Sequence, residues 1–119
     1  MLRTFARNVF LAAIAALSLL PQPWKGRLAT VGLLHDCAHI GAFFALAALT
    51  FKQRWTSRQS FLASGFLFLF GVSLEMLQTR IYHNQLEVFD ILDDLAGIAL
   101  AALVFNALKR KGARFSAPL

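Results

Sequence analysis

The chain has 119 residues, of which 58% are hydrophobic and 15% are charged. A soluble domain carries roughly 25% charged residues, so this composition argues against a soluble protein and favours a membrane protein. The formal net charge is +6, and the single cysteine, Cys37, excludes an internal disulfide framework.

Four apolar segments follow one another along the chain, at about residues 5–20, 31–51, 59–78 and 87–108. A helix needs about 20 apolar residues to cross a bilayer core of about 30 Å. The sequence therefore predicts an all-α, polytopic membrane protein, a bundle of four transmembrane helices. The connections between the segments are short, so we expect one membrane domain over residues 1–119.

The first segment follows Arg3 and Arg7, and a basic start before an apolar run is also typical of a signal peptide. Its apolar run ends in LPQPW at residues 20–24, without a small-residue cleavage pattern. We therefore predict an uncleaved helix that stops at the prolines, because proline has no amide donor and clashes with the preceding turn.

The basic residues predict the orientation. Nine of the 12 lie in the N-terminal tail, the second connection and the C-terminal tail: Arg3, Arg7, Lys52, Arg54, Arg58, Lys109, Arg110, Lys111 and Arg114. The first and third connections hold the other three: Lys25, Arg27 and Arg80. The positive-inside rule then places both termini in the cytoplasm. This placement favours membrane anchoring over nucleic-acid binding, so we expect membrane lipid and no nucleic acid as a partner.

The acids and histidines gather toward the opposite side. All of them lie near the outer ends of the second, third and fourth segments or in the third connection: Asp36, Glu75, Glu87, Asp90, Asp93, Asp94, His35, His39 and His83. A charged side chain at mid-membrane costs about 2.5–3.5 kcal/mol. Helical spacing gives three stripes: His35 and His39; Gly71, Glu75 and Gln78; and Asp90, Asp94 and Gly97. We expect these stripes to meet inside the bundle, with Gly71 and Gly97 allowing close helix packing.

Two blocks in these segments resemble the VanZ-like family of small membrane proteins. The first family block is approximately D-K-x-x-H with an aromatic residue four positions later, and residues 35–39 read HDCAH before Phe43. The second block maps without a gap to Gly71, Glu75, Gln78, Asn84, Asp90, Asp94 and Gly97. The chain departs from the family at the lysine, because His35-Asp36 replaces the Asp-Lys pair. It also departs at the loop arginine, where Asn84 stands one turn from Arg80.

The resemblance implies a multi-pass protein of the bacterial inner membrane, and the founding VanZ protein is associated with resistance to the glycopeptide teicoplanin. We expect an outer-leaflet polar pocket that binds an envelope lipid, a lipid-linked precursor or a lipoglycopeptide. Its candidate residues are His35, Asp36, His39, Glu75, Gln78, Arg80, Asp90 and Asp94. In this arrangement His39 pairs with Glu75, while Gln78 and Arg80 donate hydrogen bonds to the ligand.

Two other functions stay open. The first is a membrane-embedded enzyme, metal-assisted through His35 and His39, that acts on an envelope substrate. Carboxylate pairs support acid–base chemistry, but the sequence has no nucleophile motif such as G-x-S-x-G. The second is a structural scaffold in which the polar residues lock the helices together. A metal-free hydrogen-bonded network without a cofactor is the expected default, and both a monomer and a dimer fit the pattern.

Overall fold

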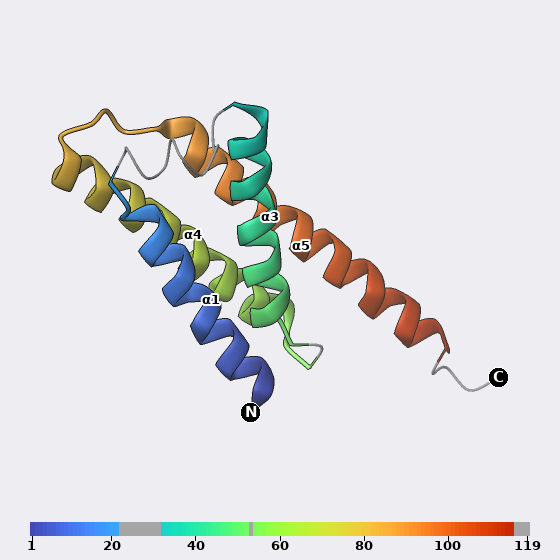
Figure 1. Cartoon of the computed structure of the whole chain (residues 1–119). Helices are drawn as coiled ribbons and strands as arrows, with labels where there is room; N and C mark the ends of the chain where they lie inside the picture. The colour runs from blue at the N-terminus through green and yellow to red at the C-terminus, as the bar shows by residue number, and fades with distance from the viewer. Residues whose placement is uncertain (22–31, 53, 116–119) are drawn as a thin grey trace.

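A computed structural model describes residues 1–21, 32–52 and 54–115. These residues form four helices and contain no strand, so the expected all-helical fold is confirmed (Figure 1). The helices are α1 (Leu2–Ser18), α3 (Leu33–Thr50), α4 (Ser57–Tyr82) and α5 (Val88–Phe115). Two of them, α3 and α4, are long and apolar enough to cross a membrane.

Consecutive helices run in opposite directions, which gives the bundle two chemically different ends (Figure 1). At one end the Arg3 guanidinium donates hydrogen bonds to backbone carbonyls in the last turn of α3, those of Ala48 and Leu49. Lys109 of α5 donates to the Trp55 carbonyl between α3 and α4. We call this end, with the N-terminus and the connection from α3 to α4, the basic end.

At the opposite end the C-terminus of α1 lies beside the C-terminus of α4, and the Tyr82 hydroxyl donates a hydrogen bond to the Leu19 carbonyl. The first turns of α3 and α5 also lie here, and each carries an acid, Asp36 in α3 and Asp90 in α5. Acids in a first turn interact favourably with the positive end of the helix dipole. We call this end the acidic end.

Helices α4 and α5 are longer than their apolar runs. The last turn of α4 contains Arg80, which the sequence analysis placed in a connection. The basic residues at positions 109–114 lie on α5 and not in a tail. Lysine and arginine are good helix formers, so the helix continues where the hydrophobic pattern ends. The first predicted connection, with Lys25 and Arg27, falls outside the described residues.

Local signals set two of the helix starts. Thr56 and Gln59 form a capping box at the start of α4, in which each side chain accepts a hydrogen bond from the other residue's backbone N–H. Gly32 precedes α3 with φ of 68° and ψ of −145°, a conformation that is essentially restricted to glycine.

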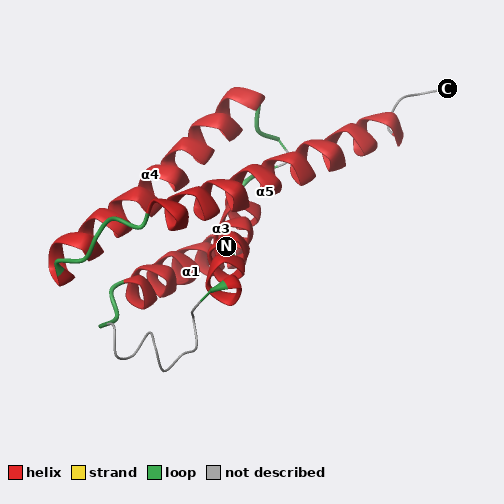
Figure 2. Ribbon diagram, turned by 90° about the horizontal axis from the view of Figure 1, so that it is seen from above, coloured by secondary structure: helices red, strands yellow, loops and turns green. Residues whose placement is uncertain are grey.

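The core lies between α3 and α5 and is closed by α4 and α1. Its buried apolar residues are Ile14, Phe43, Leu46, Ala47, Phe51, Leu67, Ile98 and Ala101. Gly97 brings the two backbones together, because a Cβ at this position would collide with the Ile40 carbonyl oxygen and lie 3.0 Å from Phe44 N. The last turns of α5 extend beyond the other helices (Figures 1 and 2). Because Gly97 sets the distance between α3 and α5, this contact decides how the polar faces of the two helices meet.

Candidate functional site

Two histidines of α3 pair with two aspartates of α5 at the acidic end. His35 Nε2 lies 3.1 Å from Asp90 Oδ2 and 3.2 Å from Asp90 Oδ1. His39 Nδ1 lies 2.8 Å from Asp94 Oδ1. Both helices place their residues four apart, so the two pairs follow each other by one helical turn.

A third contact links the two pairs. His39 Nε2 lies 3.6 Å from Asp90 Oδ2, and the two imidazole rings are 4.7 Å apart. The Asp90 and Asp94 side chains are 7% and 4% exposed, whereas those of His35 and His39 are 26% and 23% exposed. The carboxylates are therefore enclosed, and the histidines face the surface.

Helix α4 brings further polar groups to this place. Glu75 and Gln78 are buried, with 5% and 6% exposure. Glu75 and Glu87 each offer a carboxylate oxygen, and these atoms lie within 4.8 Å of one another and of an oxygen of Asp90. We call His35, His39, Glu75, Glu87, Asp90 and Asp94 together the His–acid cluster.

Gly71 makes room for the cluster on α4. A Cβ at Gly71 would lie 2.6 Å from Asp94 Oδ2 and 3.1 Å from Phe43 Cζ. Any larger residue would therefore push the Asp94 carboxylate away from His39. Gly97 lies on α5 about one turn after Asp94, and its lack of a side chain sets the distance between α3 and α5.

The sequence predicts most members of the cluster but not all of their pairings. We expected His39 to pair with Glu75, whereas its ring nitrogens face Asp94 and Asp90. The histidines of the cluster contact Asp90 and Asp94, whereas Asp36 is half-buried and Arg80 is exposed. These two residues remain candidates from the sequence alone.

Glu87 was not among the predicted site residues. It lies in the connection just before α5, and its carbonyl accepts a hydrogen bond from Asp90 N. A carboxylate three residues before Asp90, at the start of a helix, is the signal that points to it in the sequence.

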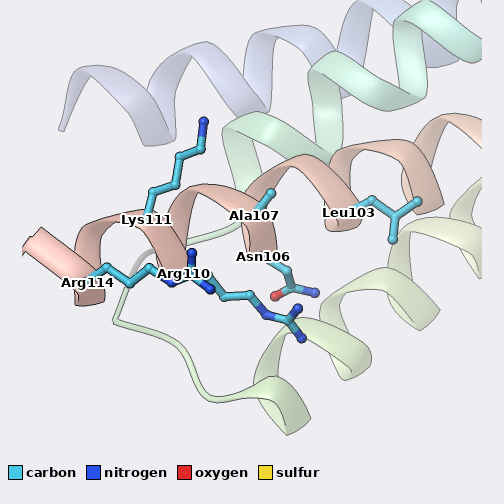
Figure 3. Close-up of a pocket in the computed structure, with 6 residues that line it drawn as sticks. All are labelled: Leu103, Asn106, Ala107, Arg110, Lys111 and Arg114. Carbon is cyan, nitrogen blue, oxygen red and sulfur yellow. The ribbon is translucent and has the colours of Figure 1, made fainter.

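A separate hollow of about 360 Å³ lies along the C-terminal half of α5. Figure 3 shows that all six lining residues come from this one helix: Leu103, Asn106, Ala107, Arg110, Lys111 and Arg114. Because the described lining residues all lie on α5, we interpret the hollow as space between neighbouring side chains. Its cations suit contact with phosphate groups at a membrane surface.

The chain matches no model of a known protein family, no curated protein and no solved structure.

The chemistry of the His–acid cluster is that of an acceptor-rich site. Ionised carboxylates only accept hydrogen bonds, and a neutral imidazole supplies a single donor. The cluster is thus suited to hydroxyl, amine or amide donors of a ligand, or to a cation.

Proposed function

We propose that this chain is a VanZ-like protein of the bacterial inner membrane that crosses the bilayer four times with both termini in the cytoplasm. The antiparallel order of the helices supports this topology, since it gathers Arg3, Lys52 and Lys109 at one end. Basic residues prefer the cytoplasmic side of a membrane. The acidic end then faces the outer leaflet.

We further propose that the His–acid cluster binds the polar headgroup of an envelope lipid, either a lipid-linked precursor or a lipoglycopeptide. The observation that carries this proposal is the burial of Glu75, Asp90 and Asp94 together at one end of an apolar bundle. Ionisable side chains within membrane helices are expensive, and they commonly mark ligand or ion sites.

The charge of the cluster favours one class of headgroup. Four carboxylates face two imidazoles, so the site attracts hydrogen-bond donors and repels bare phosphate. Sugar hydroxyls and amino groups supply such donors, as in a glycosylated lipid precursor or the sugar units of a glycopeptide. The exposed edges of His35 and His39 leave the cluster open to a headgroup that arrives from the membrane surface.

The test is native mass spectrometry of the protein extracted with its native lipids. We expect the unaltered chain to retain a glycosylated lipid, and Glu75→Gln to lose at least ~90% of it, since about 1.4 kcal/mol corresponds to a factor of 10 in binding. Glu75→Gln keeps the size of the side chain and removes its charge. The matched control is Ser73→Ala, because Ser73 is exposed on the same helix and donates only to the Leu69 carbonyl. Equal lipid retention by the unaltered chain and Glu75→Gln would contradict the proposal.

A further inference from the structure

We propose that the His–acid cluster holds one divalent transition-metal ion, with zinc as the metal it suits best, bound by His35 Nε2, His39 Nε2 and the Asp90 carboxylate. One ligand atom from each residue lies within 4.8 Å of the others. The three ligands come from α3 and α5, and the proposal does not require a bound lipid.

The spacing of the ligand atoms matches a tetrahedral zinc site. Zinc bonds to nitrogen and oxygen are about 2.0–2.2 Å long, so neighbouring ligand atoms around a tetrahedral ion lie about 3.4 Å apart. Asp90 Oδ2 lies 3.1 Å from His35 Nε2 and 3.6 Å from His39 Nε2. These two distances are close to the tetrahedral value, and a ring nitrogen of each histidine lies within 4.8 Å of one from the other.

The hydrogen bond of His39 selects the tautomer that a metal requires. The Asp94 carboxylate can only accept, so His39 Nδ1 carries the proton in this 2.8 Å contact. In a neutral imidazole, Nε2 is then a bare lone pair, and it faces a second acceptor, Asp90 Oδ2. Two acceptors so placed repel each other unless a cation lies between them. That cation is either a proton on His39 or a metal ion.

The surroundings favour the metal. Histidines that bind metals donate their other ring N–H to a carboxylate, which orients the ring and raises its basicity, as Asp94 does for His39. Asp94 is itself held in place by the space that Gly71 leaves beside it. Two histidines four residues apart on one helix are also the zinc-binding pair of the H-E-x-x-H arrangement.

The negative charge of the cluster also favours a metal ion. Glu75 and Glu87 lie within 4.8 Å of Asp90, so the cluster gathers four carboxylates with Asp94. One proton on a histidine offsets one of these charges, whereas a divalent ion offsets two. The fourth coordination position is left to Glu75, Glu87, water or a headgroup oxygen.

The experiment measures zinc binding to untagged protein in detergent, stripped with a chelator and reloaded with Zn²⁺. We expect one zinc per chain for the unaltered protein and for His83→Asn, the matched control. His83 is the third histidine, exposed at the end of α4, and asparagine tolerates its left-handed backbone, φ 54°. His39→Ala is expected to bind at least ~100-fold more weakly, and Asp94→Asn about 10–100-fold more weakly.

Cobalt provides a readout that does not depend on any variant. Co²⁺ loaded into the unaltered protein is expected to give the intense visible absorption of a tetrahedral ion with nitrogen and oxygen ligands. Absence of bound zinc and of this spectrum in the unaltered protein would overturn the proposal and assign the cation to a proton on His39. Equal zinc binding by His39→Ala and His83→Asn would also overturn it. Since no lipid is added, neither result depends on the headgroup proposal.

Discussion

Replacing Gly97 by alanine is expected to lower the free energy of unfolding by about 2–3 kcal/mol, at the upper end of the usual cost of overpacking. The added Cβ would collide with the Ile40 carbonyl oxygen and would lie 3.0 Å from Phe44 N. Both atoms belong to the α3 backbone, which cannot rotate away as a flexible side chain can. The helices must therefore separate, which also lengthens the contacts between His39 and Asp94.

The matched control is Gly41→Ala on α3, where a Cβ meets nothing within 4 Å. Alanine is favoured over glycine in a helix by about 1 kcal/mol, so this variant is expected to be as stable as the unaltered protein or more stable. Thermal unfolding in detergent, followed by circular dichroism, measures both. If Gly97→Ala unfolds at the temperature of Gly41→Ala, α3 and α5 do not approach as described.

Replacing His39 by alanine is expected to destabilise the protein by about 3–5 kcal/mol, since removal of one partner leaves a buried charge uncompensated. The Asp94 side chain is only 4% exposed and loses its 2.8 Å contact with His39 Nδ1. Asp94→Asn is expected to cost far less, because the amide oxygen still accepts the His39 hydrogen bond.

A double-mutant cycle separates this pairing from simple loss of packing. We expect His39→Ala and Asp94→Ala together to cost less than the sum of the two single variants, because no unpaired carboxylate remains. Additive losses would show that the two residues do not interact. His83→Asn serves as the control for a histidine outside the cluster.

The sequence predicted the helices better than their ends. Hydrophobic runs located the four helices that the structure describes, because apolar content and helical spacing are local properties. The charged residues after position 108 were interpreted as a tail, although α5 continues to Phe115. Hydrophobicity and helix propensity are different quantities, and lysine and arginine score low on the first and high on the second.

The sequence predicted which site residues share a helix face but not which side chains pair across the helices. The spacing of His35 and His39, and of Asp90 and Asp94, placed each pair on one side of its helix. Which helices meet depends on long-range packing, here on the contact of Gly97 with the α3 backbone. That contact directs His39 to Asp94, whereas sequence reasoning paired it with Glu75 on α4.

The central claim is that the acidic and basic ends lie on opposite sides of a membrane, and the single native cysteine makes it directly testable. In a Cys37→Ser background, Gln85→Cys places a thiol in the exposed connection at the acidic end, and Ser57→Cys places one at the basic end. A membrane-impermeant maleimide added to intact bacterial spheroplasts is predicted to label the Gln85→Cys protein. The Ser57→Cys protein is predicted to react only after permeabilisation. Labelling of Ser57→Cys in intact spheroplasts, or recovery of the chain in the soluble fraction, would contradict the account.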